Sequence, residues 1–475
     1  MKTLVWFRND LRLSDNPALS RAAIDSDAIE AVYIHCHEYV KSHPVAPVRL
    51  HFIFEHLQLL GDELAAQGIS LTLLEVKTAK EIPAAILKLA QQKSCDQLHI
   101  NAEYPLDEFV RDKNVAATCK AAGIIVRRFH DRVIVPPGMI RNGQGLPYKV
   151  FTAFKRTWLQ QATAVSWASP SSAPAFPKAV ACKFDNAVLK KWFAEADDRV
   201  AAHWPAGEAE AHERLKDFMD TAIRHYHETR DFPATEGTST LSPYLAVGSI
   251  SPRQCLGAAL HVNGGEWDTG SEGVTTWINE LIWRDFYQHV VTDFPQVCKH
   301  NPMQTYTDQF PWRKDEKVFE RWCQGQTGIP IVDAAMRQLL QTGWMHNRLR
   351  MVVAMFLTKN LQIDWRWGEH WFMSRLIDGD FAANNGGWQW SASTGTDAAP
   401  YFRVFNPVSQ SRKFDPDGHF IRQYVPELAH LDKKNIHQPP PVNGYPLPIV
   451  DLVVSRKQTI ELFGKLDRKP AETGN

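Results

Sequence analysis

The segment WINELIWRDFY, which begins at Trp277, holds residues whose types and spacing could do chemistry. In a helix, Trp277, Glu280 and Arg284 fall at i, i+3 and i+7, and Trp283 lies beside Glu280. Buried tryptophans with an exposed salt bridge would explain the pattern without a ligand. The same stripe could also form the wall of a site for a planar ligand, because aromatic faces stack on bases or flavins while charged groups orient them.

Hydroxyl side chains gather in the segment from Thr238 to Gln254. Ser242 precedes Pro243 and Ser251 precedes Pro252, and each pair is typical of an N-cap followed by the first residue of a helix. The N–H groups at two helix starts, with the hydroxyls before them, could hold a diphosphate. Simple capping is nevertheless the better explanation of this segment taken alone.

A third segment, WMHNRLRM, contains an arginine within a strongly apolar helical pattern. In a helix, Asn347, Arg350 and Met351 would share one face. A guanidinium buried alone is very costly, so Arg350 needs a carboxylate partner. The glycine-rich run LIDGDFAANNGGW supplies Asp378 and Asp380 as candidates, and its glycines let backbone approach a ligand closely. A buried structural ion pair is the alternative.

Tryptophan is concentrated in the second half of the chain, since ten of the sixteen lie between Trp277 and Trp390. Indole can donate an electron as well as fill a core, so a chain of indoles could relay charge, although such tryptophans are more often core residues. If the segment NNGGWQW is helical, Trp388 and Trp390 point about 200° apart. The two indoles could then serve different sites.

Composition excludes several function classes. Lysine plus arginine and aspartate plus glutamate both number 53, so nucleic-acid binding would need a local basic surface. The seven cysteines form no CxxC pair and are too scattered for a disulfide or zinc framework, so we expect no metal site and a reducing compartment. No apolar run is long enough for a signal peptide or a membrane span, which favours a cytoplasmic protein.

The elements that must position these residues differ between the two halves. Residues 3 to 130 alternate short β-rich runs with helical patterns, beginning with a strand at Leu4 to Phe7, and this rhythm predicts a Rossmann-like parallel sheet covered by helices. No GxGxxG or GxxxxGK[ST] motif is present, which disfavours ordinary dinucleotide and P-loop binding. A serine-, alanine- and proline-rich stretch from Thr163 to Ala179 marks a connection. We therefore expect an α/β domain at 1–130, a linker at 131–204 and a mainly α-helical domain at 205–475.

Taken together, five strings resemble the bacterial class I cyclobutane pyrimidine dimer photolyases of the photolyase/cryptochrome family. They are RDFP at Arg230, GTSTLSPYLAVG at Gly237, WINELIWRDFY at Trp277, WMHNRLRM at Trp344 and DGDFAANNGGWQWSASTGTDAAPYFRVFNP at Asp378. The similarity spans nearly the whole chain. It implies a carbon–carbon lyase in which light-excited reduced FAD donates an electron to a pyrimidine dimer in DNA, the cyclobutane bonds split and the electron returns.

The resemblance also implies a site, carried over residue by residue. FAD-contacting positions of the family fall here at Tyr226, Thr238, Ser239, Thr240, Leu241, Ser242, Trp277, Arg284, Asn347, Arg350, Asp378, Gly379, Asp380 and Asn384, the last facing flavin N5. Positions that receive the flipped-out dimer or its backbone fall at Arg230, Glu280, Trp283, Asn347, Arg348, Met351, Trp390 and Ser409. The electron relay that reduces the flavin would be Trp388, Trp365 and Trp312, and Asp378 becomes the partner of Arg350. With Glu280 bonding a thymine edge and Asn384 tuning the flavin, no metal or nucleophile is required.

An antenna pigment is implied as well. His43, Glu108, Cys298 and Lys299 match methenyltetrahydrofolate-binding positions, but Asp107 stands where the relatives have asparagine. Folate is the preferred antenna, with a deazaflavin or an empty site as alternatives.

We expect the protein to be a monomer. Three other functions are alternatives to dimer repair. A (6-4) photolyase uses paired histidines, whereas this chain has His346 followed by Asn347. A cryptochrome acting as a blue-light receptor commonly carries a long tail, and here only a short polar one follows Leu466. An electron-transfer flavoprotein without DNA would not need the pocket positions of Trp283 and Trp390.

Overall fold

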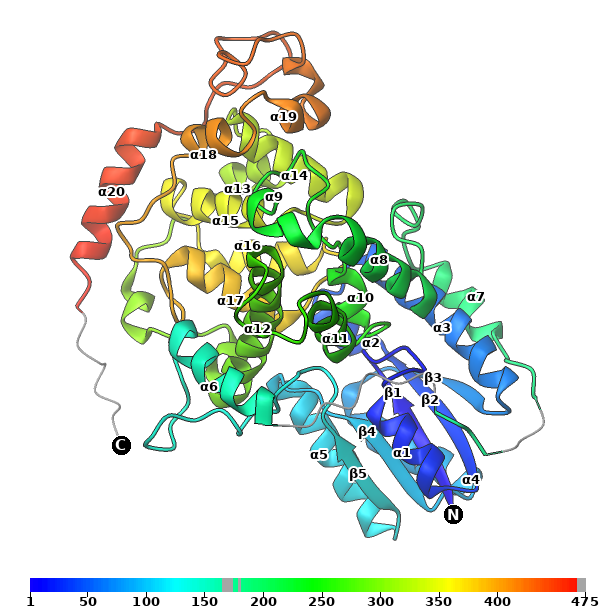
Figure 1. Cartoon of the computed structure of the whole chain (residues 1–475). Coiled ribbons are helices and arrows are strands. Elements are labelled where there is room, and N and C mark those ends of the chain that lie inside the picture. Colours follow the sequence, from blue (N-terminus) through cyan, green and yellow to red (C-terminus); the bar gives the residue numbers. More distant parts are fainter. Residues whose placement is uncertain (165–173, 178–180, 468–475) are drawn as a thin grey trace. The chain divides into compact units, whose positions relative to one another are not determined.

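The structure is a computed structural model that describes residues 1–164, 174–177 and 181–467 (Figure 1). The chain divides into two compact units. The first unit comprises Met1–Arg224, Ser239–Pro295 and Ile377–Gly379, and the second comprises His225–Thr238, Gln296–Leu376 and Asp380–Asn475. The domain limits expected at 130 and 205 stay predictions, and most of the serine- and proline-rich stretch at 163–179 lies outside the described residues.

The first unit is built on a five-stranded parallel sheet of order β3-β2-β1-β4-β5. The strands are β1 (Lys2–Phe7), β2 (Ala28–Cys36), β3 (Ser70–Val76), β4 (Gln97–Asn101) and β5 (Ile125–Phe129). This confirms the predicted α/β amino-terminal fold. Its helices are α1 (Pro17–Asp25), α2 (His37–Ser42), α3 (Pro47–Ala66), α4 (Ile82–Gln92), α5 (Leu106–Ala121), α6 (Phe151–Ala164), α7 (Ala187–Phe193), α8 (Glu208–Thr221), α10 (Ser242–Val247), α11 (Pro252–Val262) and α12 (Glu272–Asp293).

Local chemistry explains these elements. Leu4, Val5, Trp6 and Phe7 are at most 1% exposed, as expected of a central parallel strand buried on both faces. The Asn16 side chain caps α1 by accepting from the backbone N–H of Leu19. After α3, a glycine with φ of 75° at position 68 provides a left-handed stop of the kind that commonly ends a helix.

The described part of the second unit is helical, which confirms the predicted mainly α-helical class. Its helices are α9 (Tyr226–Thr229), α13 (Glu316–Cys323), α14 (Pro330–Thr342), α15 (Asn347–Met355), α16 (Trp365–Met373), α17 (Phe381–Ala392), α18 (Pro407–Phe414), α19 (His419–Tyr424) and α20 (Leu452–Gly464). Gly343 adopts φ of 68° between α14 and α15, and a π-helical turn at Phe356–Asn360 extends α15.

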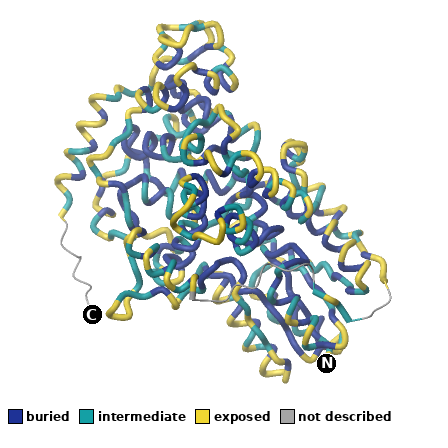
Figure 2. Tube along the Cα trace, in the orientation of Figure 1, coloured by how far each residue is buried: buried dark blue, intermediate teal, exposed yellow. Residues whose placement is uncertain are grey.

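Burial in the second unit follows the tryptophan-rich helices. One apolar cluster joins α14, α15, α16 and α17, and it contains Trp322, Trp365 and Trp388, each at most 2% exposed. By contrast α20 is mostly exposed (Figure 2). The tryptophans that the sequence marked for chemistry are therefore also core residues of this unit.

Candidate functional site

Two of the three expected relay tryptophans lie deep in the second unit and one is partly exposed. Trp365 begins α16, Trp388 lies in α17, and both are buried, whereas Trp312 precedes α13 and is half-buried. The Trp388 ring packs edge-on against Phe372 at a centroid distance of 5.1 Å. The three indoles thus include interior and surface members, as a relay to solvent requires.

The helices α16 and α17 approach closely because of Gly368. A Cβ built on this glycine would lie 2.1 Å from Cη2 of Trp388, far inside van der Waals contact. Only a residue without a side chain therefore fits opposite the Trp388 ring.

A polar network fixes the start of α17. Asn384 donates through Nδ2 to the backbone carbonyl of Glu369 at 3.0 Å, and Asn385 donates to the Glu369 carboxylate at 2.8 Å. The same carboxylate lies 2.8 Å from Nδ1 of His300. Because Glu369 is only 1% exposed, these bonds hold the Asn384 amide in one orientation.

The segment NNGGWQW is helical, within α17, and Trp388 and Trp390 differ in exposure as expected for a helix. Trp388 is 2% exposed, whereas Trp390 is half-buried. The loop after α17 returns to the helix, since the N–H of Ala399 donates to the Trp390 carbonyl at 3.2 Å. Ser393, with φ of 62°, donates to the carbonyl of Ala399 at 2.6 Å.

Sequence reasoning missed the side chain that supports this loop. Lys359 is fully buried, and its Nζ lies 2.7 Å from the Ser393 hydroxyl and 4.0 Å from the ring centroid of Phe463. Burial lowers the pKa of Lys359 well below its usual value. A lysine is ordinarily a surface residue, so its position in the sequence gave no signal.

Several expected DNA-contacting side chains of the second unit are held by neighbours. Arg348 forms two hydrogen bonds to Asp231, at 3.2 and 2.6 Å, and its guanidinium lies 4.5 Å from the ring centroid of Phe414. Lys413 lies 5.0 Å from the same ring, and Ser409 is exposed on α18. These residues place two cations beside one aromatic ring.

In the first unit, the expected stripe lies on α12. Trp277 is 3% exposed and packs on Phe218 at 5.4 Å. Trp283 stacks face to face on Phe151, with ring centroids 3.6 Å apart and an angle of 4° between the planes. One face of the half-buried Trp283 indole is therefore covered. Arg284 donates to the backbone carbonyl of the arginine at position 132.

The hydroxyl-rich segment begins two helices, but the first cap differs from the prediction. Ser251 caps α11 and forms a reciprocal capping box with Gln254, as its sequence indicates. Ser242, however, is the first helical residue of α10, whose N-cap is Leu241. The Ser242 hydroxyl instead donates to the Asp378 carboxylate at 2.6 Å. Ser242 as an N-cap was wrong, because a carboxylate distant in sequence takes its hydroxyl.

The remaining expected FAD contacts are divided between the units. Thr240 has φ of 48°, and Asp378 and Gly379 also belong to the first unit. In the second unit, Arg350 donates to the Met345 carbonyl at 2.8 Å, and Asp380 caps α17 by accepting from the N–H of residue 383 at 3.0 Å. The second unit also holds the expected FAD contacts Tyr226, Thr238 and Asn347, and the expected DNA contact Met351. Since Arg350 and Asp378 lie in different units, their pairing stays a prediction.

Three of the expected antenna residues meet in the first unit. His43 stacks on Tyr39 at 4.1 Å, and its Nε2 lies 3.2 Å from Asp107. Tyr39 donates to the buried Glu108 carboxylate. The other two, Cys298 and Lys299, belong to the second unit, and their association with this group stays a prediction.

The buried carboxylate of Asp285, which the sequence did not single out, links distant segments of the first unit by hydrogen bonds. Asp285 accepts from the backbone N–H groups of Ile134 and Val135 and from Nε1 of Trp158, at 2.9 to 3.2 Å. Burial raises the pKa of Asp285 to about 6 in spite of these donors.

Three further observations concern the described residues. In the described ranges, no group of three or more His, Cys, Asp and Glu side chains is arranged to hold a metal ion. Within the same ranges, no helix combines the length and hydrophobicity needed to cross a bilayer. All seven cysteines are free thiols.

Comparisons with known proteins place this site in a family. Residues 3–178 match the model of DNA photolyase, and residues 277–465 match that of the FAD binding domain of DNA photolyase. The chain is 46% identical over 468 residues to the deoxyribodipyrimidine photo-lyase of Vibrio cholerae, covering 97% of this chain and 98% of the relative. It is 43% identical to the Escherichia coli protein of the same name, with the same two coverages.

A solved photolyase structure is also similar to this chain along nearly its whole length. The bacterial class III photolyase from Agrobacterium tumefaciens superposes with a TM-score of 0.87 at 34% identity, covering 98% of this chain and 97% of that one. The predicted family is thereby confirmed, and FAD is the cofactor that its helical domain accommodates. The chain belongs to the DNA photolyase family.

Proposed function

We propose that this protein uses light to split cyclobutane pyrimidine dimers in DNA, with FAD as the electron donor. The observation that carries the proposal is the fixed Asn384 amide, with the buried Trp388 one helical turn further along α17. When bound and reduced, FAD supplies the light-excited electron that the reaction requires. The chain's own residues bind it, orient it and receive the lesion.

The diphosphate and ribose of FAD would be held by the hydroxyl segment from Thr238 to Ser242. Its residues 238 to 240 are half-buried and Ser242 is exposed, so the hydroxyls can reach a ligand. The bond from Ser242 to Asp378 fixes one end of the segment at 2.6 Å. Arg214 lies 3.4 Å from the Thr240 hydroxyl and supplies positive charge near the phosphates.

The flavin ring would be tuned by Asn384. Its Nδ2 is used by the Glu369 carbonyl, so the side-chain oxygen is the atom that remains to accept a hydrogen bond. An acceptor of this kind suits the N5–H of a reduced flavin. The Asn385 and His300 bonds to Glu369 hold that acceptor in place.

The lesion would meet aromatic faces and one carboxylate. Phe151 covers one face of Trp283 and leaves the other for a base, and the half-buried Trp390 offers a second indole. Base–aromatic stacking contributes about 1–3 kcal/mol per base. Glu280, on the same helix as Trp283, would accept a hydrogen bond from a thymine edge.

The carboxyl-terminal edge of the sheet, where α/β folds commonly bind ligands, is filled by side chains. Arg8 lies 3.2 Å from Asp112, and Arg111 lies 2.6 Å from Glu103. Both guanidiniums also cover Trp6, at 4.4 and 4.9 Å from its ring centroid. A flat pigment at this edge would have to separate buried ion pairs, and breaking one costs several kcal/mol.

For this reason we favour methenyltetrahydrofolate near His43 over a deazaflavin at the sheet edge. The stacked His43 and Tyr39 rings offer an aromatic wall. Asp107 accepts from His43 where an asparagine would offer both a donor and an acceptor. We further propose that the protein is a monomer in the cytoplasm.

The proposal is tested with an oligonucleotide that carries a single thymine dimer. The purified, reduced protein should restore the thymines in blue light and not in the dark. A parallel oligonucleotide with a (6-4) photoproduct should stay unrepaired. Repair of only the (6-4) lesion, or tight DNA binding without any repair, would favour the photolyase of that class or a light receptor instead.

A further inference from the structure

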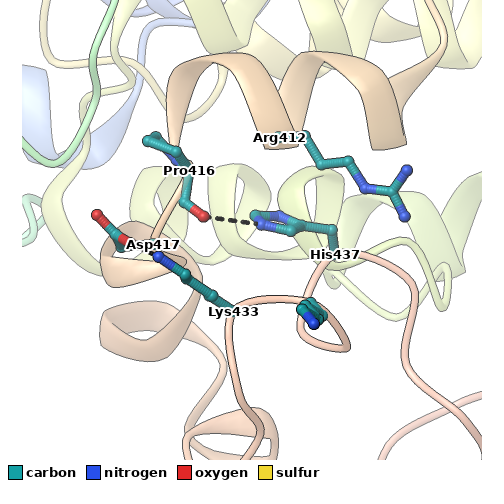
Figure 3. A pocket seen from close by; sticks show the side chains of 6 residues that line it. Arg412, Pro416, Asp417, Lys433 and His437 are labelled. Carbon is teal, nitrogen blue, oxygen red and sulfur yellow. Dashed lines mark hydrogen bonds and ion pairs between the residues drawn. The ribbon is translucent and has the colours of Figure 1, made fainter.

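A basic cavity in the second unit lies outside every site described above. It has a volume of about 340 Å³ and lies among the end of α18, the turn before α19 and the segment 433–437. Its lining residues are Arg412, Pro416, Asp417, Lys433, Lys434 and His437. Figure 3 shows Lys433 beside Asp417, and the His437 ring facing the carbonyl of Pro416 across the cavity from Arg412.

The wall of this cavity is rigid. His437 is 2% exposed, its Nε2 donates to the Pro416 carbonyl at 3.3 Å, and its Nδ1 lies 2.6 Å from the Ser411 hydroxyl, within hydrogen-bonding distance. Asp415, behind the wall, accepts from the backbone N–H groups of residues 420 and 421 at 3.0 Å. The imidazole is therefore held in one orientation in the wall, and the side chains of Arg412, Lys433 and Lys434 lie around it.

The charge of the cavity is positive. Lys433 lies 3.5 Å from Asp417, an exposed and loose pair. Among the described residues, neither the Arg412 guanidinium nor the Lys434 ammonium has a recorded ion pair. The neighbouring Asp432 carboxylate is engaged by backbone N–H groups of the turn that follows it. Arg412, Lys433 and Lys434 thus stand against the carboxylates of Asp417 and the neighbouring Asp432, which leaves the net charge positive.

The helix dipole does not account for this arrangement. A cation at position 412 would be stabilised by the carboxyl end of α18, but Lys433 and Lys434 come from a separate segment. Like charges gathered around a concave surface repel one another unless an anion occupies it. The chemistry therefore fits a phosphate group.

Arg412 lines the cavity and is also exposed on α18, the helix that carries the expected DNA-contacting residue Ser409. Ser409, Arg412 and Lys413 follow one another at i, i+3 and i+4 on the exposed side of α18. From Ser409 to Arg412 the helix rises about 4.5 Å. Successive phosphates of one strand are spaced about 3.4 Å along the duplex axis. The two spacings are similar, so we expect a strand that contacts Ser409 to bring a neighbouring phosphate near Arg412, which lines the cavity.

We propose that this cavity binds a backbone phosphate of DNA flanking the lesion, outside the pocket that receives the dimer. The inference rests on the proposed repair function. In this proposal, Arg412, Lys433 and Lys434 extend the stretch of DNA that the protein contacts beyond the dimer. It assigns them no role in the photochemistry.

The test compares Lys433→Gln/Lys434→Gln with a control of equal charge change, Lys77→Gln/Lys80→Gln, whose lysines are exposed on the first unit. Dissociation constants are measured at several salt concentrations for two DNAs that contain a dimer. One is a short fragment of three or four nucleotides, and the other is a long duplex. For the duplex, the slope of the logarithm of the binding constant against the logarithm of the salt concentration should be shallower by about 1–2 in the cavity variant than in the wild type. Binding and repair of the short fragment should be unchanged, and the control should match the wild type on both.

Three results would overturn the inference. The first is an equal salt slope for the cavity variant and the control on the duplex. The second is an equal loss on the short fragment, which would place the lysines at the lesion. The third is binding of inorganic phosphate to the wild type but not to the cavity variant, while phosphate at matched ionic strength leaves DNA affinity unchanged, which would assign the cavity to free phosphate. Absence of light-dependent repair of the short fragment by the wild type would instead refute the repair function itself.

Discussion

Replacing Gly368 by alanine inserts a methyl group against the ring of Trp388. The new Cβ would lie 2.1, 2.4 and 2.7 Å from three ring carbons, so ring and helix must separate by about 1.3 Å to reach ordinary contact. The ring has little freedom to retreat, because Phe372 and Trp322 pack against it at centroid distances of 5.1 and 6.0 Å. The strain must be taken up by the junction of α16 and α17.

The expected cost follows from two opposing effects. Overpacking a core typically costs about 1–3 kcal/mol, and alanine gains about 1 kcal/mol over glycine in a helix. Because the ring is enclosed, the steric cost should lie at the upper end, and the variant should lose about 1–2 kcal/mol of unfolding free energy. Photoreduction of the oxidised flavin should also slow, since Trp388 is the buried member nearest Asn384 in sequence.

Urea unfolding and blue-light photoreduction measure the two effects. The matched control is Gly464→Ala in α20, where nothing lies within 4 Å of the added Cβ. That control should be unchanged or slightly more stable, and it should photoreduce normally. If Gly368→Ala is as stable as the control and photoreduces at the wild-type rate, the close contact with Trp388 has no role in the relay.

Three further changes have defined outcomes. Trp312→Phe should abolish photoreduction but leave repair by chemically reduced protein intact, and loss of both would contradict a relay role. Ser242→Ala removes the bond to Asp378 and should weaken FAD binding about tenfold, measured by flavin release on dilution. The pKa of Asp285 is raised to about 6 in the native state, whereas an aspartate in the unfolded chain has a pKa of about 3.9. Between these two pH values the native protein keeps the Asp285 proton and the unfolded chain releases it. Stability from this group therefore falls by about 3 kcal/mol as pH rises from 4 to 6, and Asp285→Asn should remove that fall from urea unfolding curves; an unchanged pH profile would refute the shift.

Local signals made the framework predictable. The strand at Leu4 to Phe7, the glycine stop after α3 and the capping box at Ser251 depend on residues within a few positions of one another. Each signal acts through backbone geometry or a nearby hydrogen bond, so it is readable without the fold.

Contacts between distant residues were not predictable from the residues alone. Ser242 and Asp378 are 136 positions apart, and this bond changed the role of Ser242 from a cap to a partner of a carboxylate. Asp285 and Ile134 are 151 positions apart, and no sequence pattern marks either one. Lys359 was missed because its burial depends on the packing of several helices, which overrides the usual exposure of lysine.

The most direct measurement of the central claim is the excited-state lifetime of the reduced flavin in the protein. The lifetime should shorten when an oligonucleotide with a thymine dimer is added, and it should recover after illumination has consumed the dimer. An undamaged oligonucleotide of the same sequence should leave it unchanged. A lifetime that is the same with damaged and undamaged DNA would contradict electron donation from the flavin to the lesion.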